Sequence, residues 1–206
     1  MNQSMHNSEC NINNIRFVKG IRGDDSILTE QIPQIAFAGR SNVGKSSTLN
    51  RLLGRGIARV SSTPGKTQEI NFFSIEMNSA YVVDLPGYGY AKMSAERANK
   101  MRKQMIWYLA SKAPIVLICL VIDIRRGLGD MDRDLLDIAS GEGRPVVVVA
   151  NKIDKCNQKE RVAAERKLEK DLESHPEIIY GVIAFSAKTG KGSNALCKVI
   201  QSIYAV

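Results

Sequence analysis

Two short polar motifs, each directly after an apolar run, contain the residues in this chain that are best suited to chemistry. The first, at residues 39–46, reads GRSNVGKS and has the form GxxxxGKS. The second, at residues 151–154, reads NKID and has the form NKxD. A glycine-rich loop that opens a helix predicts a phosphate site. An aspartate that accepts hydrogen bonds from guanine N1–H and the exocyclic amine predicts that the bound base is guanine.

The first motif supplies the groups that a nucleoside triphosphate requires. We expect Gly39 and Gly44 to permit the turn and the close approach of backbone N–H groups to phosphate oxygens. Lys45 would reach the β- and γ-phosphates, and the Ser46 hydroxyl would bind Mg²⁺. The predicted binding residues of this loop are Gly39, Arg40, Ser41, Asn42, Val43, Gly44, Lys45 and Ser46.

A third motif, Asp84-Leu85-Pro86-Gly87, ends the apolar run 80–84. Its carboxylate predicts a Mg²⁺ ligand acting through water, and the Gly87 N–H is placed to sense the γ-phosphate. The polar, turn-rich segment 61–68 is typical of a mobile loop that folds over the nucleotide. It contains two candidate magnesium hydroxyls, Thr63 and Thr67, and physical chemistry alone does not choose between them.

Base recognition is predicted at two loops near the C-terminus. The carboxylate of Asp154 would bind guanine, Asn151 would brace the loops, and the Lys152 stem would lie along the base plane. A second loop after the apolar run 178–185 can present a backbone N–H to guanine O6. The residues expected to contribute are Asn151, Lys152, Ile153, Asp154, Phe185, Ser186 and Ala187.

The elements that must position these motifs alternate between apolar strands and helical stretches. Continuous Val, Ile and Leu runs indicate strands buried on both faces, and the strand–helix alternation favours a parallel α/β sheet. We expect six strands, one of them an antiparallel edge strand in a hairpin, with helices on both faces. The predicted strands are 34–38, 70–76, 80–84, 115–122, 145–150 and 178–185. The predicted helices are 45–54, 94–111, 130–140, 157–173 and 192–204.

Length and composition are those of one globular unit. The chain has 206 residues, of which 44% are hydrophobic, and we expect a disordered tail over 1–14 and a single domain over 15–206. Its longest apolar run, 113–122, is too short to cross a bilayer, and the polar N-terminus lacks a signal pattern. A cytoplasmic location, no membrane association and a monomer are therefore expected. The dispersed cysteines are expected to be free thiols.

Net charge suggests a further partner. The chain carries a net charge of +8, and its basic residues concentrate in two segments, 40–66 and 87–112. A solvated basic face would explain this pattern, and so would a polyanionic partner such as rRNA or the ribosome.

The motifs GRSNVGKSS, TPGKTQ, DLPGYGYA, NKxD and FSA together resemble the bacterial EngB (YihA/YsxC-like) GTPases. This family lies within the TrmE–Era–EngA–EngB–septin group, and the resemblance covers roughly residues 15–204. It implies a P-loop GTPase fold, GTP/GDP and Mg²⁺ as ligands, a role in assembling the large (50S) ribosomal subunit, and a link to cell division and septation. Matching its GKTQ motif selects Thr67 as the second magnesium ligand. That motif adds Gly65, Lys66, Thr67 and Gln68 to the expected nucleotide site, together with the adjacent Glu69.

Slow hydrolysis is expected, with Lys45, Thr67 and Gly87 as the catalytic groups. Tyr88 stands where many GTPases place a water-orienting glutamine, and a phenol lacks the paired donor and acceptor of an amide. Asn42 occupies the position at which related GTPases coordinate K⁺, so K⁺ is a candidate activator; alternatively Asn42 only stabilises its loop. Arg125 and Arg126 are either arginine fingers supplied in cis or part of an ordinary basic loop.

Two other functional classes remain open on the sequence. A P-loop kinase would share the GxxxxGKS loop, but NKxD would have no role in it. A non-ribosomal GTP-binding module that regulates cell division with little turnover would fit the replacement of glutamine by Tyr88.

Overall fold

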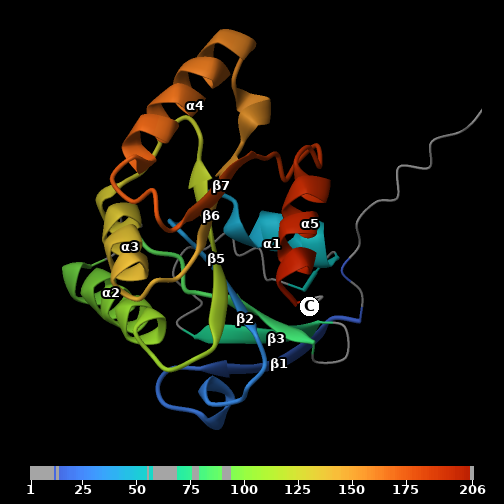
Figure 1. The fold of residues 1–206 in the computed structure, drawn as a ribbon, viewed down its shortest axis with the longest axis vertical. Helices are drawn as coiled ribbons and strands as arrows, with labels where there is room; N and C mark the ends of the chain where they lie inside the picture. The colour runs from blue at the N-terminus through green and yellow to red at the C-terminus, as the bar shows by residue number, and fades with distance from the viewer. Residues whose placement is uncertain are drawn as a thin grey trace, which may run out of the picture.

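The computed structural model of the chain describes residues 12, 14–54, 56, 57, 69–75, 79–89 and 94–204. Helices flank a central sheet on both sides (Figure 1). The strands are β1 (Arg16–Ile21), β2 (Gln34–Gly39), β3 (Ile70–Ile75), β4 (Ala80–Asp84), β5 (Ile115–Asp123), β6 (Val146–Asn151) and β7 (Ile179–Ala184). The helices are α1 (Lys45–Leu53), α2 (Ala95–Leu109), α3 (Asp130–Gly141), α4 (Gln158–Leu172) and α5 (Ser193–Tyr204), with short 3₁₀ turns η1 (Ser26–Leu28) and η3 (Ile153–Lys155).

The sheet confirms the expected α/β class and corrects its strand count. Its order is β1-β3-β4-β2-β5-β6-β7, with seven strands rather than six. Strand β3 pairs antiparallel with both β1 and β4, and the other pairings are parallel. The antiparallel strand therefore lies one place inside the edge. Strand β1 escaped prediction because its charged residues and exposed Phe17 and Val18 hide the apolar pattern of a strand.

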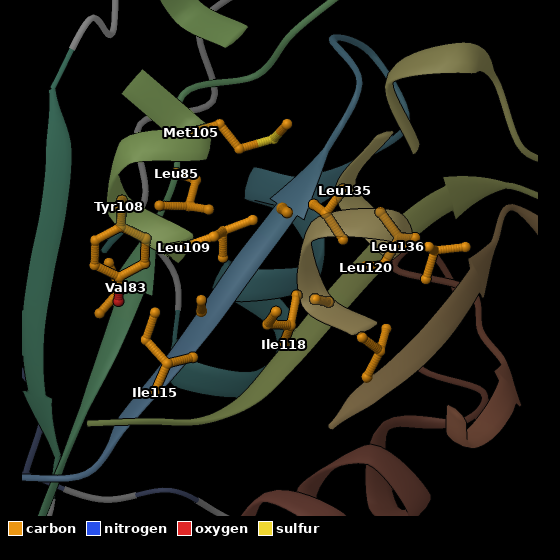
Figure 2. Close-up of a cluster of buried hydrophobic side chains, with 14 of the residues drawn as sticks. Val83, Leu85, Met105, Tyr108, Leu109, Ile115, Ile118, Leu120, Leu135 and Leu136 are labelled. Atoms are coloured by element: carbon orange, nitrogen blue, oxygen red, sulfur yellow. The ribbon is translucent and has the colours of Figure 1, made fainter. Parts of the chain in front are cut away.

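Two apolar layers hold the helices against the sheet. Figure 2 shows Met105, Tyr108 and Leu109 of α2 and Leu135 and Leu136 of α3 gathered over the strands on one face. Residues of α4 join the same cluster, whereas α1 and α5 pack on the opposite face. Strands β5 and β6 are buried along nearly their whole length, which explains their continuous apolar sequence.

The remaining expectations concern the N-terminal tail, the cysteines and membrane-spanning helices. Most of the predicted tail 1–14 lies outside the described residues, although Ile12 is buried among residues of the α1 and α5 layer. Cys119 and Cys156 are free thiols as expected, but Cys197 is disulfide-bonded. The expectation failed there because spacing along the chain does not show which thiols meet in the fold. Among the helices of the described ranges, none has the length and apolarity of a membrane span.

Candidate functional site

Three of the motifs lie at one edge of the sheet because each follows a parallel strand. The GxxxxGKS loop follows β2, the DxxG segment follows β4 and the NKxD segment follows β6. The carboxyl ends of parallel strands share an edge, and this is where α/β folds bind ligands. The fold therefore brings together side chains that are far apart in the sequence.

Close packing at the GxxxxGKS loop requires its two glycines. Gly44 has a φ of +99°, and a Cβ there would lie 2.3 Å from Nδ2 of Asn151. A Cβ at Gly39 would lie 2.4 Å from the carbonyl oxygen of Val121. Both distances are shorter than any tolerable contact, so side chains at these positions would push the loop away from β5 and β6.

Lys45 begins α1 and forms a buried ion pair with Asp84 at the end of β4. These residues are only 8% and 7% exposed. Ser46 follows in the first helical turn and is half-buried. Hydroxyl and carboxylate oxygens are the hard donors that Mg²⁺ prefers, so this donor set fits the expected metal. A bound phosphate would give the Lys45 ammonium a second anionic partner beside Asp84.

Hydrogen bonds connect the DxxG segment to β2 and to the phosphate loop. The Ser41 N–H donates to the Tyr88 carbonyl at 2.6 Å, and the Ser41 hydroxyl donates to the Gly87 carbonyl at 3.2 Å. Leu85 N–H donates to the Phe37 carbonyl at 3.0 Å. A displacement of Gly87 would therefore act directly on the loop that carries Ser41.

Tyr88 is buried, and its hydroxyl donates to Oδ1 of Asp132 in α3 at 2.7 Å. The other carboxylate oxygen of Asp132 accepts the Gly129 N–H at 2.8 Å. Burial raises the pKa of Tyr88 well above its usual value, so the phenol is a neutral donor. Asp132 was not among the predicted site residues, and its only sequence signal is its place three residues after Gly129, in the spacing of a helix cap.

The NKxD segment connects three loops. Asn151 Nδ2 donates to the Val43 carbonyl at 2.8 Å, and its Oδ1 accepts the Ala187 N–H at 3.1 Å. The Ser186 hydroxyl donates to Oδ1 of Asp154 at 2.7 Å. Asp154 is otherwise exposed, which leaves carboxylate lone pairs available to a ligand. Ile153 and Phe185 are buried beneath these polar groups.

Arg125 is engaged within the protein. Its guanidinium donates to both carboxylate oxygens of Asp123, at 2.9 and 2.7 Å. Arg126 is exposed and lines a small hollow together with Arg40, Ser41 and Asn42. Within the described ranges, no ion pair of this kind holds Arg126, the other candidate arginine finger. Asp123 was also missed, because an acidic residue ending a strand carries no distinctive pattern.

Part of the predicted site lies outside the described residues. Glu69 is half-buried and pairs with Arg22 at 3.2 Å. The remaining residues of the 61–69 region named above lie outside the described residues, namely Thr63, Gly65, Lys66, Thr67 and Gln68.

Comparison with protein families agrees with this geometry. Residues 34–152, more than half of the chain, match the family described as 50S ribosome-binding GTPase. Residues 109–205 match the elongation factor Tu GTP-binding domain. The probable GTP-binding protein EngB of Oleidesulfovibrio alaskensis is 42% identical over 87% of this chain and 80% of its own length.

Solved structures give the same result. A crystal structure of a probable GTP-binding protein EngB superposes with a TM-score of 0.63 at 27% identity, covering 84% of this chain and 98% of that one. Era in complex with MgGDPNP and nucleotides of 16S ribosomal RNA superposes with a TM-score of 0.64 at 26% identity, covering 84% of this chain and 57% of that one. The chain belongs to the EngB family of GTP-binding proteins, a family of GTPases.

Proposed function

We propose that this chain is a Mg²⁺-dependent GTP switch that acts in assembly of the 50S ribosomal subunit and is needed for normal cell division and septation. The main support for this proposal is that the Lys45–Asp84 pair and the Asp154–Ser186 pair both lie at the carboxyl ends of the parallel strands. The first pair suits phosphate and metal, and the second suits a guanine base. The residues end or follow strands β2, β4, β6 and β7 at the carboxyl end of the sheet, where α/β folds bind nucleotides.

Each site residue has one role in this proposal. Lys45 binds the β- and γ-phosphates, and Gly87 senses the γ-phosphate through its N–H. Ser46, Thr67 and, through water, Asp84 hold Mg²⁺, which would offset phosphate charge. Asp154 recognises guanine.

The ribosomal part of the proposal draws on relatives and on charge. The matching family is described as ribosome-binding, and the similar Era structure is a complex with 16S rRNA. On α2, Lys100 and Lys103 are exposed, one helical turn apart. A basic helix following the γ-phosphate sensor suits a partner that is a polyanion. A cytoplasmic monomer is the form that we propose to act.

Co-sedimentation with purified 50S and 30S subunits tests the ribosomal role. We expect retention on 50S with a non-hydrolysable GTP analogue, less with GDP, and a loss as salt rises. Equal pelleting with both nucleotides would contradict a switch. No retention in either state would overturn the ribosomal assignment and favour a GTP-binding module that regulates division directly.

We further propose that K⁺ accelerates the slow hydrolysis through Asn42, whose side chain is exposed at the loop. Single-turnover hydrolysis should be faster in KCl than in NaCl. Asn42 has a φ of +67°, so Asn42→Gly removes its side chain without straining the backbone. That variant should lose the difference between the two salts. Equal rates for the wild-type protein in both salts would show that Asn42 only shapes the loop.

A further inference from the structure

Asp123 is a buried carboxylate at the carboxyl end of β5 that none of the motifs includes. Its side chain is 2% exposed, and it lies opposite Asn151 in the pairing of β5 with β6. The Ile124 N–H donates to the Asn151 carbonyl at 3.0 Å, which fixes the start of the next loop. Asp123 is therefore held beside the NKxD segment by the sheet itself.

Two basic side chains converge on this carboxylate. Arg125 binds it in a bidentate manner and also donates its backbone N–H at 3.2 Å. Lys152 places Nζ 3.0 Å from Oδ2. Burial would raise the pKa of Asp123, but the hydrogen bonds from Arg125 and Lys152 outweigh burial and lower it to about 2. The carboxylate is thus ionised at any physiological pH.

Lys152 is fixed at both ends. Its backbone has a φ of +69°, a left-handed conformation that non-glycine residues rarely adopt. Its ammonium also donates to the Asn42 carbonyl in the phosphate loop. The four-carbon stem must therefore run between the NKxD backbone and the phosphate loop.

We propose that Asp123, bound by Arg125, is a positioning residue that keeps the Lys152 stem along the plane of the guanine base. This inference rests on the proposed guanine site and adds two residues to it. Arg125 alone already gives the carboxylate a bidentate counter-charge. Asp123 nevertheless binds a second cation, Lys152, which belongs to the base-recognition motif and bridges to the phosphate loop.

A double-mutant cycle tests the proposal with GDP as the probe. Asp123→Asn should weaken GDP binding about tenfold to a hundredfold, the range for losing a hydrogen bond to a charged group. Lys152→Met should weaken it comparably. The double variant should bind GDP no more weakly than Lys152→Met alone, since Asp123 acts through Lys152. Additive losses would overturn the proposal and leave Asp123 as a structural residue.

A probe without a base separates positioning from general damage. In Asp123→Asn, the affinity for inorganic pyrophosphate, measured by competition, should fall far less than the affinity for GDP. Equal losses of the two affinities would contradict a role at the base. Asp171→Asn, which breaks the ion pair with Arg133 between α3 and α4, is the matched control and should bind GDP like the wild type.

A second variant keeps the test decisive if Asp123→Asn does not fold. The Arg125 side chain is 45% exposed, so Arg125→Met should fold. This substitution should weaken GDP binding in the wild-type protein but not in the Lys152→Met variant. A wild-type protein that failed to bind GDP would refute the guanine site together with this inference. Normal wild-type binding with unaltered binding in Arg125→Met and Asp123→Asn would refute the inference alone.

Discussion

Tyr88, at the position where many GTPases place a water-orienting glutamine, has a structural role in this fold. The residue directly after Gly87 could reach toward the γ-phosphate, but the Tyr88 side chain is buried and its hydroxyl contacts Asp132. Burial raises the pKa of Asp132, while the hydrogen bonds from Gly129 and Tyr88 act in the opposite direction. At the scale of single residues, Tyr88 thus stabilises a buried carboxylate and joins the DxxG segment to α3.

Removing this hydroxyl should cost stability. Tyr88→Phe leaves the buried Asp132 with one hydrogen-bond donor fewer, and we expect the free energy of unfolding to fall by about 1–3 kcal/mol. Urea denaturation at pH 7 measures the change. Tyr180→Phe is the matched control, because Tyr180 is 59% exposed on β7 and its hydroxyl should contribute less than about 0.5 kcal/mol. Equal midpoints for the two variants would show that the Tyr88–Asp132 contact does not stabilise the fold.

At the scale of elements, long-range polar contacts decide how the helices meet the sheet. Arg144, at the start of the segment that leads into β6, donates to the carbonyls of Leu109, Ser111 and Ala113. These carbonyls lie at and after the end of α2, where they have no intrahelical partner. One side chain thereby fastens the end of α2 beside the start of β6.

Contacts of this kind also limit what the sequence can predict. The helices and six of the strands were predictable because their apolar periodicity is local, and the loop motifs because their spacing is fixed by phosphate chemistry. Strand β1 was not, since its charged residues and exposed Phe17 and Val18 leave neither a continuous nor an alternating apolar run. Asp123 and Asp132 were missed because tertiary structure brings them their partners Lys152 and Tyr88.

At the scale of the whole molecule, polar contacts connect the DxxG segment to α2 through α3. Tyr88 joins the DxxG segment to α3, and Arg102 of α2 pairs with Asp134 of α3 at 2.9 Å. Helices α2 and α3 lie side by side on one face of the sheet (Figure 1). If a nucleotide displaced Gly87, these contacts would transmit the displacement to α3 and α2, which is how a nucleotide would alter the affinity of a distant surface.

The basic face of α2 should govern partner binding without governing nucleotide binding. Lys100→Glu with Lys103→Glu reverses two exposed charges and leaves the Arg102–Asp134 pair intact. We expect weaker retention on 50S subunits and a shallower dependence on salt, because fewer counterions are released, with GDP affinity close to that of the wild type. The matched control is Lys167→Glu with Lys170→Glu on α4, which has the same spacing and charge change on exposed residues. If both pairs weakened 50S binding equally, net charge rather than the α2 surface would attract the partner; if neither did, the partner would bind elsewhere on the molecule.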